Sequence, residues 1–173
     1  LDKRNCDFPP LRLNVRKGEV AGTLFEGQDK LKLVTHCRDW DSYEQNVLEE
    51  YLAYRLYNLL TDISFRVRLA GITYRDVRGE EDPLTRMGFL IEEDEALASR
   101  HGGTVIEVPA APAAHFQQEQ TGLMYLFQFM IGNNDYSVVS GHNRKAIYQD
   151  EKFIVIPYDF DLSGLVNADY GKS

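Results

Sequence analysis

The chain has 173 residues, and its 19 Lys and Arg against 27 Asp and Glu give a net charge of −8. Hydrophobic residues make up 43% and charged residues 27%, which is typical of a globular protein with one domain or one two-lobed domain. A disordered or collagen-like chain is excluded, and no apolar run reaches the ~18 residues that a membrane span needs. The acidic balance argues against binding of duplex nucleic acid but is compatible with a nucleotide held through a cation.

The two ends of the sequence predict a fragment, because it begins on Leu1 rather than Met and stops directly after a patterned segment. The start is polar and has no secretory signal pattern. The two cysteines, Cys6 and Cys37, lack metal-type spacing and form either two reduced thiols or one disulfide. Because they flank two strands that are expected to pair, we predict that they lie close in space. A disulfide would indicate an extracytoplasmic protein.

The first part of the chain, residues 1–108, predicts a sheet with one long helix. Apolar patterning predicts its strands, at 11–15, 31–35, 63–69 and 88–91. A capping pattern begins the helix, which is expected over residues 42–60. Its buried stripe is expected to consist of Leu48, Tyr51, Leu52, Leu56, Leu59 and Leu60.

The second part begins after a Pro- and Ala-rich stretch at 109–114, which predicts a stiff connector. Residues 115–173 are expected to start a helical lobe. A helix over 116–131 is apolar nearly all round, so we expect it to be buried. A β-hairpin follows, with strands over 145–148 and 153–156.

The second part also holds the residue types that phosphoryl transfer needs. A loop after the apolar helix carries Asp135 and Asn143, and the hairpin leads on to Asp159 and Asp161. In this chemistry one Asp accepts or orients the proton of the substrate hydroxyl, while an Asn and a second Asp hold Mg²⁺. Solvated turns would explain the same aspartates without any catalytic role.

The first part offers a cation and a carboxylate that suit phosphate binding. Lys32 lies in the middle of an apolar strand, and the next helix carries Glu49 and Glu50. Kinases use a strand lysine and a helix glutamate to hold the α- and β-phosphates. On a helical wheel Glu49 falls on the apolar stripe and Glu50 on the opposite face, so the pattern alone does not decide between them.

The order of these motifs resembles the spore-coat protein H (CotH-like) kinases, an atypical family with the protein-kinase fold. The resemblance covers most of the chain and lies in the lysine strand at 30–33, the helix at 41–56, the strand at 88–92, the loop at 134–143 and the acidic segment at 156–161. It implies an α+β, two-lobed, protein-kinase-like fold. It also implies an enzyme that binds ATP with Mg²⁺ or Mn²⁺ and transfers the γ-phosphoryl group to a hydroxyl of a protein or small molecule.

The resemblance also implies roles for individual residues, in which the family register favours Glu50 over Glu49. Asp135 would be the catalytic base. The metal ligands would be Asn143, Asp159 and Asp161, and the nucleotide contacts would be Lys32, Glu50 and Glu92. The expected partners are therefore a nucleotide and an unidentified hydroxyl-bearing acceptor.

The sequence departs from the kinase pattern at three places. Asn143 follows Asp135 by eight positions, whereas the spacing in ordinary kinases is five. Position 49 is Glu, whereas the family has Arg. The sequence also shows no Gly-rich phosphate loop of the expected form. A catalytically inactive, kinase-like structural or binding module is therefore a second hypothesis. A hydrolase with paired carboxylates, such as a glycosidase, is a third.

Overall fold

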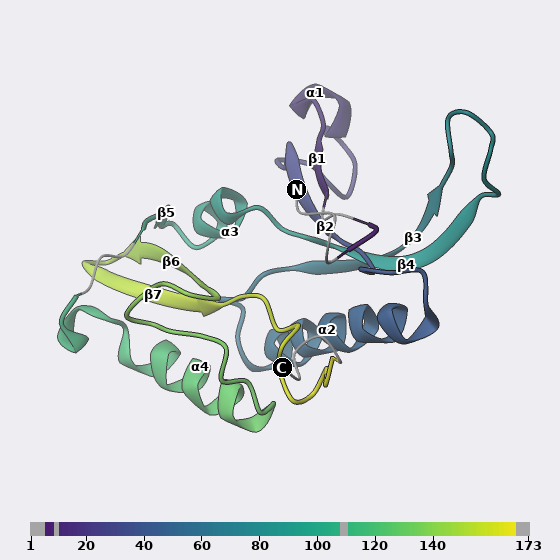
Figure 1. The fold of residues 1–173 in the computed structure, drawn as a ribbon. Helices are drawn as coiled ribbons and strands as arrows, with labels where there is room; N and C mark the ends of the chain where they lie inside the picture. The colour runs from purple at the N-terminus through teal and green to yellow at the C-terminus, as the bar shows by residue number, and fades with distance from the viewer. Residues whose placement is uncertain (1–5, 9–10, 108–110, 169–173) are drawn as a thin grey trace.

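The computed structural model describes residues 6–8, 11–107 and 111–168 (Figure 1). Its helices are α1 (Lys17–Val20), α2 (Asp41–Leu60), α3 (Asp94–Arg100) and α4 (Gln118–Met130), with a 3₁₀ turn at Ala113–His115. Its strands are β1 (Leu11–Asn14), β2 (Lys30–Val34), β3 (Val67–Tyr74), β4 (Leu84–Ile91), β5 (Thr104–Val105), β6 (Arg144–Gln149) and β7 (Lys152–Pro157). The chain is thus a mixed α+β protein, as the sequence predicts.

The strands form two antiparallel sheets, with the orders β1-β2-β4-β3 and β5-β6-β7. The predicted pairing of the first two strands is confirmed, with Leu11 opposite Leu33. Strand β5 belongs to the first part of the sequence yet pairs with β6, so that part contributes a strand to the second sheet. The predicted connector at 109–114 begins outside the described residues.

One of two hydrophobic clusters among the described residues joins the two sheets, and a smaller one lies between α4 and β7 around Met124 and Val155. Helix α2 packs on β4 of the first sheet, and α4 packs on β7 of the second (Figure 1). The Tyr54 ring lies 5.7 Å from Phe89 and 4.7 Å from Phe160, which in turn lies 5.7 Å from Phe127. Phe160 is fully buried, so the segment after β7 is anchored where α2 and α4 meet.

The predicted buried stripe of α2 is wrong in part. Tyr51 and Leu56 are partly buried against the core, but the leucines at 52, 59 and 60 are exposed. The fully buried residues of the helix are Val47, Glu50, Ala53, Tyr54 and Tyr57. The rings of Tyr54 and Tyr57 pack tilted or edge-on against Phe89, Phe160 and Phe127, and both hydroxyls have hydrogen-bond partners. This rotation of the helix brings Glu50 into the interior.

The strand predicted at 63–69 begins only at Val67 and continues to Tyr74. In the loop just before it, two carbonyl groups are bonded to side chains instead of to a neighbouring strand. Asn58 donates to the Phe65 carbonyl oxygen at 2.8 Å, and Arg100 donates to that of Ser64 at 2.6 Å. Side-chain donors therefore replace the strand ladder at Ser64 and Phe65, whereas the Arg66 carbonyl accepts from the Glu92 backbone N–H at 3.0 Å.

Helix α4 is buried on one face only, so the expectation of complete burial is wrong. Met124 and Phe127 are buried, whereas Leu126, Phe129 and Met130 are 70%, 85% and 63% exposed. On the buried face, Met124 shares a cluster with Val155 of β7, and the Phe127 ring lies 4.8 Å from that of Tyr57 on α2. Among the described residues no helix is long and apolar enough to cross a membrane.

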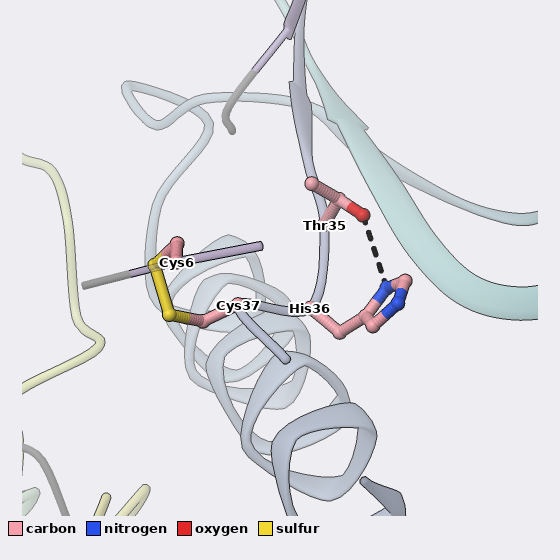
Figure 2. Close-up of a disulfide and its surroundings, with 4 residues drawn as sticks. All are labelled: Cys6, Thr35, His36 and Cys37. Atoms are coloured by element: carbon pink, nitrogen blue, oxygen red, sulfur yellow. Dashed lines mark hydrogen bonds between the residues drawn. A yellow bond between two sulfur atoms is a disulfide. The ribbon is translucent and has the colours of Figure 1, made fainter. Parts of the chain in front are cut away.

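Cys6 and Cys37 form a disulfide with their Cα atoms 4.6 Å apart (Figure 2). This confirms that the two cysteines lie close in space, and the alternative of two reduced thiols is wrong.

Candidate functional site

A cavity of about 590 Å³ brings together four of the residues that the sequence singles out. Lys32 comes from β2, Glu50 from α2, and Asp159 and Asp161 from the segment that follows β7. Three parts of the chain that are far apart in sequence thus contribute charged side chains to one cavity. Glu49 does not line this cavity; its carboxylate accepts a hydrogen bond from Gln45 on the same helix at 3.0 Å.

Two features position the acidic segment. Phe160, between the two aspartates, is fixed in the core, and the Asp159 backbone N–H donates to the Tyr54 hydroxyl at 3.0 Å. Asp159 has a φ of +63°, a left-handed conformation in which Asp and Asn are among the better tolerated residues. A bend around a buried aromatic anchor therefore directs both carboxylates to the cavity.

The charge of Lys32 is stabilised by its neighbours in the cavity. Burial disfavours the charged form, but Asp159, Tyr158 and Glu50 outweigh it, so the pKa of Lys32 is raised. Its Nζ lies 4.4 Å from the centroid of the Tyr158 ring, a cation–π contact. Within the described part of the chain, no ion pair of 4.0 Å or less joins Lys32 to Glu50. The lysine is thus a fixed cation that contacts the aromatic ring.

Glu50 is the most perturbed carboxyl group of the cavity. Burial, together with the charges of Asp159 and Asp161, raises its pKa to about 8, although Lys32 and a backbone hydrogen bond at Phe160 favour the charged form. Its Oε1 atom is buried without a hydrogen-bond partner. A buried acceptor without a partner is unfavourable, and a bound cation or donor at this position would relieve it.

The loop predicted to be catalytic is a compact hydrogen-bonded unit. The Asn143 side-chain Nδ2 donates to the Asp135 backbone oxygen at 2.8 Å and to its Oδ2 at 2.9 Å. His142 Nε2 lies 2.9 Å from Asp135 Oδ1. The Asp135 side chain is one-third exposed, so the carboxylate is held in place yet reachable from solvent.

This loop is connected to the acidic segment through one backbone hydrogen bond. Asn143 precedes β6, and its carbonyl oxygen accepts a bond from the Tyr158 N–H at 3.1 Å. Tyr158 is the residue before Asp159, so Asn143 and Asp159 lie at the same end of the hairpin. Convergence of Asp135, Asn143 and Asp159 within about 8 Å of one point, as a shared Mg²⁺ requires, stays a prediction.

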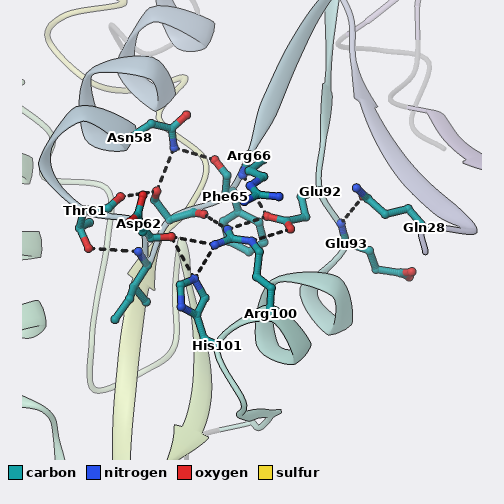
Figure 3. A network of polar contacts seen from close by, with 12 residues as sticks. Gln28, Asn58, Thr61, Asp62, Phe65, Arg66, Glu92, Glu93, Arg100 and His101 are labelled. Atoms are coloured by element: carbon teal, nitrogen blue, oxygen red, sulfur yellow. Dashed lines mark hydrogen bonds and ion pairs between the residues drawn. The ribbon is translucent and has the colours of Figure 1, made fainter. Parts of the chain in front are cut away.

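A smaller hollow of about 140 Å³ adjoins the cavity and shares Lys32 with it. Glu92, Glu93, Lys145 and Tyr158 also line this hollow. The Glu92 carboxylate is already engaged, because Arg100 Nε and Nη2 donate to its two oxygens at 2.9 Å each (Figure 3). A nucleotide contact by the Glu92 side chain would have to compete with this bidentate pair.

The donor set around the cavity fits a hard cation such as Mg²⁺, which prefers carboxylate and carbonyl oxygens. Asp159 and Asp161 offer carboxylates to the cavity. Asn143 does not line it; its side-chain nitrogen donates to Asp135, which leaves its amide oxygen as a candidate ligand atom at the same end of the hairpin. Among the described residues, no three His, Cys, Asp or Glu side chains form a ready-made metal cage. Mg²⁺ does not need one, since it is commonly bound by one or two carboxylates together with substrate phosphates.

Three residues of the site are missed by motif reasoning. Tyr158 contacts Lys32, Tyr54 bonds the backbone of Asp159, and Phe8 lines the cavity from the N-terminal segment. The aromatic residue directly before the acidic segment is a local signal for the first. The other two depend on tertiary packing.

Comparison of the chain with protein-family models, with curated proteins and with solved structures found no match. The assignment of function is therefore argued from the residues and geometry of this chain.

Proposed function

We propose that the chain is a CotH-like atypical kinase domain that binds Mg-ATP and transfers its γ-phosphoryl group to a hydroxyl of a protein or small molecule. The observation that carries the proposal is the cavity shared by Lys32, Glu50 and Asp159. A strand lysine, a helix glutamate and an aspartate after a hairpin form the set that phosphoryl transfer uses. We also propose the protein-kinase-like two-lobed fold as the finer description of the α+β architecture.

In the proposed complex the nucleotide occupies the larger cavity, whose volume of about 590 Å³ is in the range of small-molecule sites. Lys32, in the wall of that cavity, binds the phosphates. Asp159, with Asn143 and Asp161, holds the metal. When bound, Mg²⁺ supplies positive charge that neutralises the phosphate oxygens.

The chemical step needs a proton acceptor beside the acceptor hydroxyl. The hydroxyl oxygen attacks the γ-phosphorus, the bond to the β–γ bridging oxygen breaks, and ADP leaves. Asp135 takes the hydroxyl proton, and its hydrogen bonds with His142 and Asn143 hold the carboxylate in position. Residues of the chain thereby provide phosphate binding, metal ligation and proton transfer.

The test compares Asp159→Asn with Asp150→Asn. Both aspartates have positive φ, +63° and +48°, and they lie at opposite ends of the hairpin, so the two changes make matched demands on the backbone. Mg-ATP should raise the melting temperature of the parent and of Asp150→Asn but not that of Asp159→Asn, and ADP release should follow the same pattern. Without ligand, Asp159→Asn should be at least as stable as the parent, because it removes one of several clustered negative charges.

Two results would contradict the proposal. One is a parent protein whose melting temperature does not respond to millimolar Mg-ATP. The other is an Asp159→Asn variant that is destabilised by about 0.5–2 kcal/mol, as expected for a lost turn cap, while its nucleotide response is unchanged.

A catalytically inactive kinase-like binding module is the second candidate. It is favoured by the position of Lys32, which contacts the Tyr158 ring instead of pairing with Glu50. In active kinases the lysine–glutamate pair is in place during transfer. This candidate predicts nucleotide binding without ADP release or phosphoryl incorporation, so the same assays separate the two.

A further inference from the structure

The N-terminal segment, residues 6–8, forms part of the wall of the larger cavity. Cys6 and Phe8 line this cavity together with Cys37, Lys32 and Asp159. The segment belongs to no helix or strand. Its position therefore depends on a few specific contacts.

Those contacts are centred on the disulfide (Figure 2). Cys6 is bonded to Cys37, and the backbone N–H groups of Asp7 and Phe8 donate to the Cys37 carbonyl oxygen at 2.9 and 3.2 Å. The Phe8 ring centroid lies 4.2 Å from that of the fully buried His36. The segment is thus attached to the chain that runs on directly from the lysine strand β2.

We propose that the Cys6–Cys37 disulfide is a positioning element of this cavity, so that binding of Mg-ATP beside Lys32 depends on oxidised cysteines. This inference rests on the proposed nucleotide site. A dithiol reductant gives two electrons and two protons to the S–S bond, which leaves one thiol on each cysteine, and the dithiol becomes a disulfide. Both cysteines are partly exposed, so a small dithiol reaches them.

Loss of the disulfide should open this wall. Two backbone hydrogen bonds and the aromatic contacts of Phe8 would remain, and their net stabilisation is similar in size to the entropy of ordering three residues. A detached segment admits water beside Lys32 and Asp159, where it weakens the charge interactions that hold phosphate and metal. Since disulfides persist in oxidising compartments, the site would be complete there and weakened under reducing conditions.

The test measures access to the cavity separately from nucleotide binding. Acetylation of lysines by an activated ester is followed by mass spectrometry in the oxidised protein, the dithiol-reduced protein and a Cys6→Ser/Cys37→Ser variant. Lys145 is the internal control, because it is bonded to Asp94 at 2.8 Å and lines only the smaller hollow. Mg-ATP affinity is measured by calorimetry on the same three samples.

Opening of the wall should raise the acetylation rate of Lys32 by about tenfold and weaken Mg-ATP binding by a similar factor, with Lys145 unchanged. Adding dithiol to the double variant should change neither quantity. An unchanged Lys32 rate overturns the inference, and so does a parallel rise at Lys145, which would show general unfolding. A faster Lys32 rate with unaltered Mg-ATP affinity overturns the dependence of binding on the disulfide. A protein that binds no Mg-ATP in any of the three samples refutes the proposed function and, with it, the dependence of Mg-ATP binding on the disulfide. A faster acetylation of Lys32 alone in those samples would still show that the disulfide holds residues 6–8 over Lys32.

Discussion

The buried carboxyl group of Glu50 predicts that stability falls as the pH rises. Its pKa is raised from 4.5 to about 8 in the folded protein, so the folded state binds this proton more tightly than the unfolded chain does. The stabilisation is complete below pH 4.5 and is lost as the pH rises towards 8. Each pH unit in this window lowers the free energy of unfolding by at most about 1.4 kcal/mol.

Replacement of Glu50 by Gln should remove this dependence. At pH 7 this carboxyl group is charged in the unfolded chain and has to take up a proton on folding, because its pKa is about 8 in the folded protein. That lowers the free energy of unfolding by about 3 kcal/mol relative to acidic pH, and a neutral amide of nearly the same shape avoids this cost. Its NH₂ group can also donate to Asp159 or Asp161, the two carboxylates that raise the Glu50 pKa. The variant should therefore be more stable than the parent at pH 7 and similar to it near pH 4.5.

Urea titrations between pH 4.5 and 8.5 measure the effect. Glu49→Gln is the matched control, because Glu49 is the neighbouring residue outside the cavity and its loss should change stability by no more than about 0.5 kcal/mol. Parallel stability curves for the parent and Glu50→Gln, or a Glu50→Gln variant that is weaker at pH 7, would refute the reasoning. A gain in stability together with weaker Mg-ATP binding is the trade-off expected of a residue kept for function.

Two further predictions concern the framework of the site. In β4, Gly88→Ala would place a methyl group 2.8 Å from the carbonyl oxygen of Val34 in β2 and should destabilise the protein by about 1–3 kcal/mol. Gly71→Ala in β3 is the control, because nothing lies within 4 Å of the added methyl group. Equal melting temperatures of the two variants would contradict the expected clash. Glu92→Gln should lower the free energy of unfolding by about 3 kcal/mol, because it breaks a buried ion pair with Arg100. Thermal melts check this, with a Glu95→Gln variant at an exposed position as the control. A loss of stability as small as that of the control would show that the ion pair contributes little.

Local pattern predicts the elements of this chain well where hydrogen bonding is local or regular. Helix α2, expected over 42–60, is found at Asp41–Leu60, and the turn of the second hairpin falls at Asp150 and Glu151, both with positive φ. The stretch before β3 escapes this reasoning. It alternates like a strand, but the side chains of Asn58 on α2 and Arg100 on α3 satisfy the carbonyl groups of Phe65 and Ser64.

The helical wheel of α2 fails for a related reason. Counting leucines places the buried face at 48, 52, 56 and 59, but the leucines at 52 and 59 are exposed and Ala53 and Tyr54 are buried. Hydrophobicity alone does not register that Tyr54 has a partner for its hydroxyl in the Asp159 backbone. The face is chosen by contacts with a segment more than a hundred residues later.

The same interaction explains why Glu50 is inside. Tyr54 lies one turn after Glu50 on the same face of α2, so a helix that turns Tyr54 towards Asp159 must also turn Glu50 towards the acidic segment. Burial of Tyr54 against Phe89 and Phe160 stabilises this orientation, and the unfavourable burial of the Glu50 carboxyl group follows from it. Glu50 is therefore destabilising in the protein without ligand and is held in place by its neighbours. Such an arrangement is expected where a ligand that carries positive charge completes the site.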